Sequence, residues 1–128
     1  MAKKQNTESP YMKACKVLCI EPRPELADRS NPGLVSEDGY HRLRICIEAK
    51  NMLYGKIWRP IYDGSETHYW PYFKQTPSGL GFTSTDYGRW LTSTYVWPRL
   101  EYRSSELATQ GAKEFIKYYN DFFNNSNN

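Results

Sequence analysis

Three side chains that can exchange protons, Asp63, Glu66 and His68, lie close together in the sequence. Carboxylates and imidazoles are common general acids and bases, so this segment is the first place to look for catalysis. The same residues also suit a polar turn, because the Asp of an Asp–Gly pair hydrogen-bonds its own backbone and the His can begin a strand. We favour the turn, and we therefore predict no catalytic residues and a protein that is not an enzyme.

The cysteines are the second candidates for chemistry. Cys15 and Cys19 are one helical turn apart and could ligate a metal together with His41 or His68. However, Cys15, Cys19 and Cys46 all fit apolar helix faces, where burial raises the pKa of a thiol and suppresses its reactivity. No glycine-rich loop opens a helix to hold phosphate. We predict no metal site, no nucleophilic cysteine and no cofactor.

The segment GFTSTDYGRWLTSTY, residues 81–95, combines aromatic rings, hydroxyl groups and Arg with few aliphatic side chains. Tyr and Trp give broad contact at a small cost in conformational entropy, and Arg adds a charge with a flat face that stacks. A small domain can also use such rings to fill its core. We expect part of them to form a binding surface, whose ligand-binding residues are Tyr72, Tyr87, Arg89, Trp90 and Arg99.

Two helices are predicted in the first part of the chain. Ser9 followed by Pro10 is a helix start, because the hydroxyl caps a free N–H and Pro tolerates the first helical position. The apolar spacing then indicates a helix over about residues 10–20, followed by a proline-rich loop. The pattern after this loop fits a strand or a helix, and its length favours a helix over about 37–53 with Ser36 as its cap.

Residues 54–102 hold most of the aromatic residues and all four Trp. Aromatic and β-branched side chains suit a half-buried sheet, and Asp63–Gly64 and Pro77–Gly79 are typical turns. This part of the chain therefore predicts an antiparallel sheet. The candidate strands are residues 57–62, 68–74, 80–85 and 95–102.

A closing helix is predicted after the sheet, capped by Ser104 or Ser105 and apolar on one face. Gly111 lies inside it and is expected to allow close approach to a strand or a ring. The predicted fold is α+β, with two N-terminal helices, a three- to four-stranded antiparallel sheet and a C-terminal helix packed on the sheet. Residues 10–123 would form the single domain, between disordered tails at 1–9 and 124–128.

Composition narrows the classes of partner. The chain has 128 residues and a net charge of +3, far from the dense basic surface of a protein that coats duplex DNA. No apolar run is long enough to cross a bilayer. The odd number of cysteines and the polar first residues indicate a reducing compartment. We expect a cytoplasmic protein, in the host cell if a phage encodes it, with no membrane partner.

The stretch HYWPYF…SGLGFTSTDYGRWLTSTYVWPRLEYRSSELATQGAKEFIKYYNDFF resembles a family of small uncharacterised proteins of phages and prophages of gut anaerobes. That family shows an ACKVLGI-type start, an apolar helix ending near an Asn, a W-x-P-x-W-x-D segment, a YYPWF strand and a GSRLCFKSxELAxYAGKQF segment. Tyr62, Trp97–Pro98 and Gln110–Gly111 depart from this pattern. The resemblance implies a mobile-element origin and no particular activity. The matching segments here are Ala14–Ile20, the helix ending at Asn51, Trp58–Pro60–Tyr62–Asp63, Tyr69–Phe73 and Trp97–Phe115.

These observations predict a non-enzymatic phage or prophage accessory protein that works by binding. The first hypothesis is a nucleotide or single-stranded nucleic acid, stacked on Tyr72, Tyr87 and Trp90 and neutralised by Arg89 and Arg99. One form of it is an anti-defence protein that sequesters a cyclic nucleotide signal. The alternative is a protein–protein interaction module, either an inhibitor of a host protein or a small structural component.

Overall fold

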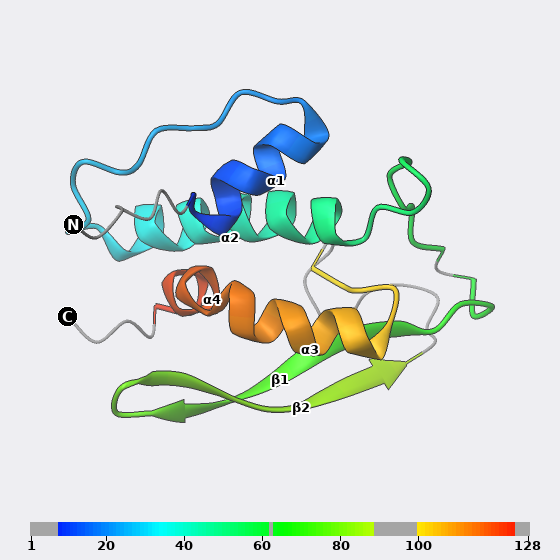
Figure 1. The fold of residues 1–128 in the computed structure, drawn as a ribbon. Helices are drawn as coiled ribbons and strands as arrows, with labels where there is room; N and C mark the ends of the chain where they lie inside the picture. The colour runs from blue at the N-terminus through cyan, green and yellow to red at the C-terminus, as the bar shows by residue number, and fades with distance from the viewer. Residues whose placement is uncertain (1–7, 62, 89–99, 125–128) are drawn as a thin grey trace, which may run out of the picture.

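Four helices and one β-hairpin form three layers in the computed structural model, which describes residues 8–61, 63–88 and 100–124 (Figure 1). Helix α1 packs on α2, and α3 and α4 lie between α2 and the hairpin. The predicted α+β class is therefore confirmed. The elements are α1 (Pro10–Leu18), α2 (Pro32–Lys50), β1 (His68–Thr76), β2 (Gly79–Gly88), α3 (Ser105–Glu114) and α4 (Ile116–Phe122).

Helix α1 begins as predicted. The Ser9 hydroxyl accepts a hydrogen bond from the Met12 N–H at 3.2 Å, and Pro10 occupies the first turn. The helix ends two residues earlier than expected, because Cys19 adopts a left-handed conformation with φ 58° and its N–H bonds to the last turn.

Helix α2 starts earlier than the predicted residue 37. Asn31 is its cap, accepting hydrogen bonds from the N–H groups of Gly33 and Leu34, and Pro32 occupies the first turn. Ser36 is therefore inside the helix, where its hydroxyl donates to the Phe122 carbonyl at 2.6 Å. Pro32 was interpreted as part of a loop, but a proline after a capping Asn opens a helix.

The sheet has two strands in the described residues, so the prediction of three or four is not met there. β1 and β2 pair antiparallel from His68 opposite Gly88 to Thr76 opposite Gly79, with a bulge next to Tyr72. Residues 57–61 form no strand; the Ile61 N–H donates to the Glu66 carboxylate at 2.8 Å instead. Of the predicted last strand, residues 95–99 lie outside the described residues.

The closing helix is divided into α3 and α4. Ser104 caps α3 by accepting the Leu107 N–H at 3.1 Å. Phe115, with φ −108° and ψ 20°, separates the two helices, and its ring is buried in the core. This break lets α3 lie on both strands while α4 packs mainly against α2.

Tyr102 joins the hairpin to the helices. Its N–H and C=O exchange hydrogen bonds with Tyr69 at 2.7 and 3.0 Å. Its buried hydroxyl lies 2.8 Å from that of Tyr119, and burial raises the pKa of Tyr102 well above the ordinary value. A β-carbon on Gly111 would overlap the Tyr102 ring, so the predicted close approach of Gly111 to a ring is confirmed.

Tyr11 connects α1 to several other parts of the chain. Its backbone N–H donates to the Tyr118 hydroxyl at 3.2 Å, although the two residues are 107 positions apart. Its own hydroxyl accepts from the Arg23 N–H at 2.7 Å and lies 2.9 Å from Nε2 of His41. The Arg42 guanidinium lies over its ring at 4.4 Å and pairs with Asp38 at 2.7 Å. These contacts hold the irregular segment 19–31 against the helices.

We expect Gly111→Ala to destabilise the protein by about 2 kcal/mol or more, since overpacking outweighs the helical preference for Ala. The new methyl group would displace the Tyr102 ring and break its hydrogen bond with Tyr119. Urea denaturation measures the loss. Gly81→Ala is the matched control, because the nearest atom to its β-carbon would be 3.6 Å away; equal losses in both variants would contradict the packing argument.

The stability of the fold should fall on mild acidification through His41. Burial, then the charges of Arg23, Arg44 and Arg42, lowers the pKa of His41 below its ordinary value. The unfolded chain therefore binds the proton more readily, and stability is lost as pH falls below about 6.5 towards the folded pKa. Denaturation measured between about pH 7.5 and 5 should show that His41→Gln loses less free energy of unfolding on acidification than the unaltered protein does. If the free energy of unfolding falls equally with pH in both proteins, folding does not change the pKa of His41.

Candidate functional site

One face of β1 points away from the helices. Tyr69 and Phe73 pack against the core, with the Phe73 ring 4.6 Å from that of Tyr119. Because side chains alternate along a strand, the even-numbered residues of β1 lie on the opposite face. We name this face the outer row, and it consists of His68, Trp70, Tyr72 and Lys74.

The outer row is buried at its His68 end. The His68 Nε2 atom lies 2.9 Å from the Glu66 carboxylate, and Nδ1 faces Glu101 at 3.6 Å. The Trp58 and His68 rings meet edge to face at 5.9 Å between their centroids, and the Trp58 Nε1 donates to Glu66 at 3.3 Å. His68 is fully buried with a carboxylate at each nitrogen. No nitrogen of this ring is therefore directed at a substrate, as a general base requires.

Asp63 takes no part in this cluster. Its carboxylate accepts hydrogen bonds from the backbone and hydroxyl of Ser65, which lower the pKa of Asp63. Of the three acid–base candidates, the structure brings Glu66 and His68 together and leaves Asp63 in its own exposed turn. The turn interpretation of Asp63 is confirmed, while the buried partner Glu101 was not foreseen.

Asn51 holds Glu101 in place. Its amide donates to the Glu101 carbonyl at 2.8 Å and accepts from the Arg103 N–H at 2.9 Å. The Arg103 guanidinium in turn donates to the Asn51 carbonyl at 2.9 Å. A void of about 20 Å³ remains beside Glu101 and Trp58, which is room for about one water molecule. This interior is too small for a substrate.

The outer row is open at its other end. Tyr72 is 59% exposed although it lies in the middle of the strand, and Lys74 is also exposed. Trp70, next along the row, is half-buried. A ring held on a strand with one face open to solvent can stack on a flat ligand, and a neighbouring ammonium group can meet an anion.

The structure locates only part of the predicted binding site. Tyr72 lies at the surface, and the backbone of Tyr87 pairs with that of Tyr69, while the Tyr87 side chain lies outside the description. Arg89, Trp90 and Arg99 lie outside the described residues. Trp70 and Lys74 were not among the predicted binding residues, although the two-residue period that places Tyr72 outward places them on the same face.

The three cysteines differ in their surroundings. Cys15 and Cys46 are buried, and burial raises the pKa of Cys46 to about 12. Cys19 is exposed beyond the end of α1. Within residues 8–61, 63–88 and 100–124, no three His, Cys, Asp or Glu side chains are grouped to hold a metal. Nor is any helix in these ranges long and apolar enough to span a membrane.

Comparison of the chain with protein-family models, with curated proteins and with solved structures finds no match. The resemblance to phage proteins therefore stays a prediction. Any function must be argued from the chemistry of the surfaces described above.

Asn51→Ala should cost about 2–4 kcal/mol of stability, because it leaves the Glu101 carbonyl and the Arg103 N–H without their partner. Thermal and urea unfolding measure the change. Gln110→Ala, on the exposed side of α3, is the control and should stay within about 0.5 kcal/mol of the unaltered protein. If Asn51→Ala loses no more free energy of unfolding than the control, Asn51 does not hold Glu101 in place.

Proposed function

We propose that the protein binds a nucleotide or a single-stranded nucleic acid through the open end of the outer row, without catalysing a reaction. The observation that carries the proposal is the exposure of Tyr72, which is 59% exposed at the open end of the outer row. A large ring in mid-strand is ordinarily used to cover a core, and Tyr69 and Phe73 already do so.

The neighbours of Tyr72 suit such a ligand. Trp70 extends the aromatic surface on one side, and Lys74 lies on the other, about 6.5 Å along the strand. This spacing lets a base stack on Tyr72 while its phosphate lies near the Lys74 ammonium group. Each stacked base contributes on the order of 1 to 3 kcal/mol. Tyr87, Arg89, Trp90 and Arg99 remain predicted contributors.

The carboxylates around His68 favour binding over catalysis. His68 is the described residue of the outer row best able to move protons, and its ring is fully buried, with Glu66 hydrogen-bonded to Nε2 at 2.9 Å and Glu101 3.6 Å from Nδ1. The cluster instead fixes the start of β1, which gives the open end of the row a rigid support. The resemblance to phage proteins supports a role as an accessory factor in the host cytoplasm, with the sequestering of a nucleotide signal as one form of it.

A second candidate function is protein–protein interaction. Tyr54 is 93% exposed, with φ 52°, in a two-residue turn closed by hydrogen bonds of 3.0 Å between Leu53 and Lys56. Ile57 and Ile61, further along the same irregular segment, are also exposed. A bulky residue with positive φ is unusual. The segment that follows α2 extends away from the helices (Figure 1), and exposed apolar residues on such a loop are typical of contact surfaces.

Tyr72→Ala should weaken binding of nucleotides or short single strands by roughly tenfold or more, the scale of one lost base stack. Tyr72→Phe should bind like the unaltered protein, since it keeps the ring. The measurement is a thermal-shift panel of nucleotides, cyclic nucleotides and oligonucleotides, followed by titration of each ligand that stabilises the fold.

Tyr54→Ala is the matched control, because it removes a still more exposed tyrosine from a different surface. Equal weakening in Tyr54→Ala and Tyr72→Ala, or no stabilisation by any ligand at millimolar concentration, would overturn the nucleotide proposal. A protein partner that binds Tyr72→Ala but not Tyr54→Ala would establish the second candidate instead.

A further inference from the structure

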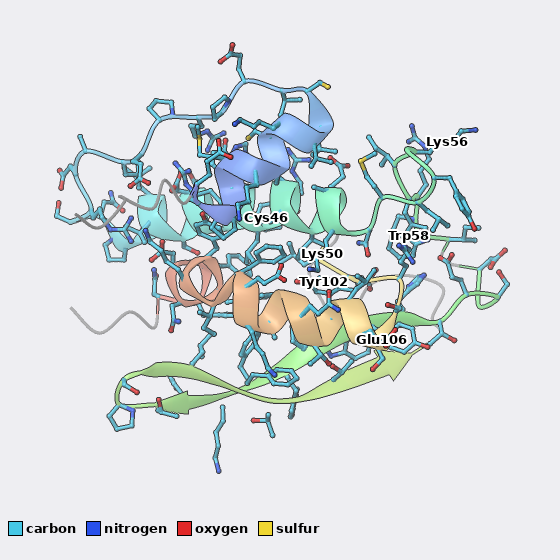
Figure 2. The ribbon with its side chains drawn as sticks, in the orientation of Figure 1. Cys46, Lys50, Lys56, Trp58, Tyr102 and Glu106 are labelled. Atoms are coloured by element: carbon cyan, nitrogen blue, oxygen red, sulfur yellow. The ribbon has the colours of Figure 1, made fainter. Side chains whose placement is uncertain are left out.

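A groove of about 450 Å³ lies where three helices meet, on the helical side of the molecule. One wall is a face of α1, the other is the end of α2, and the remaining contacts come from the break between α3 and α4. Figure 2 shows Cys46 and Lys50 on the side of α2 that faces this junction. The volume is within the range of about 300 to 1,000 Å³ that small-molecule sites occupy.

The lining of the groove is mainly apolar. Ala14 and Val17 come from α1, Cys46 and Ala49 from α2, and Phe115 from the helix break. Val17 lines the groove and is 52% exposed to solvent. The thiol of Cys46, whose pKa is raised by burial, stays protonated and acts as an apolar group. An apolar tail that enters the groove would remove this surface from water, which is favourable.

The charged residues at the rim give the groove a net positive charge. The Lys50 ammonium group pairs with Glu114 at 2.8 Å, so these two charges neutralise each other. Lys13 lies on the opposite wall and is exposed, and no described residue forms an ion pair with it. The groove therefore carries one net positive charge, located on the α1 side. Glu114 would repel an anion near Lys50, which leaves Lys13 as the partner for a negative head group.

We propose that this groove binds a small amphipathic carboxylate, such as a medium-chain fatty acid, with its tail over Ala49 and Phe115 and its carboxylate at Lys13. The layer formed by α3 and α4 separates this site from the outer row, so the two sites are distinct (Figure 1). The proposal does not depend on the nucleotide proposal.

Titration with decanoate below its micellar concentration tests the proposal, with decanol as the uncharged ligand of the same tail length. Calorimetry should show saturable binding of one decanoate, and thermal denaturation should shift upwards. Lys13→Glu should weaken decanoate binding by about three- to tenfold, the scale of one exposed ion pair replaced by repulsion. The same variant should leave decanol binding unchanged.

Two further variants make the test specific. Lys117→Glu alters an exposed lysine of α4 outside the groove and should bind decanoate like the unaltered protein. Ala49→Phe fills the groove and should abolish binding of both ligands, with circular dichroism confirming that it folds. Absence of saturable decanoate binding would overturn the proposal, as would equal affinities in Lys13→Glu and Lys117→Glu. Backbone amide shifts confined to β1 rather than to Ala14 and Ala49 would also overturn it.

Discussion

The fold depends on the buried ring of Tyr102. Its backbone exchanges hydrogen bonds with Tyr69 of β1, its hydroxyl bonds with Tyr119 of α4, and its ring occupies the space left by the missing side chain of Gly111 in α3. One residue thus connects three elements of the fold, β1 through its backbone and α3 and α4 through its side chain. Because a two-stranded hairpin is at best marginally stable by itself, this contact is what gives β1 a fixed position against the helices.

Because one face of β1 packs against the helices, part of its other face is exposed to solvent. The inward residues Tyr69 and Phe73 pack on α3 and α4, and the same pleat turns Tyr72 towards solvent. The cluster of Glu66, His68 and Glu101 then limits the exposed part of the row to its far end. A central layer of helices therefore has the sheet on one side and α2 on the other, and the two proposed ligand surfaces lie on opposite sides of this layer.

Features that depend on neighbouring residues, such as helix caps, were predictable from the sequence. Contacts between distant segments were not. Ser9 and Ser104 cap helices where their sequences indicate, because a cap needs only residues three positions apart. The start of α2 at Pro32 followed from the same rule, but the surrounding prolines favoured a loop. In the site, the exposure of Tyr72 follows from alternation, whereas the approach of Glu101 to His68 depends on a backbone bridge between distant segments that no local pattern reveals.

The hydrogen bond between the Tyr11 backbone and the Tyr118 hydroxyl makes α1 depend on a residue 107 positions further along the chain. During synthesis, α1 and α2 leave the ribosome long before the helices that cover them. Their apolar sides therefore stay exposed to water, or bound to a chaperone, until α3 and α4 have been synthesised. Contacts between such distant residues also raise the contact order, which slows folding relative to a simple helical bundle.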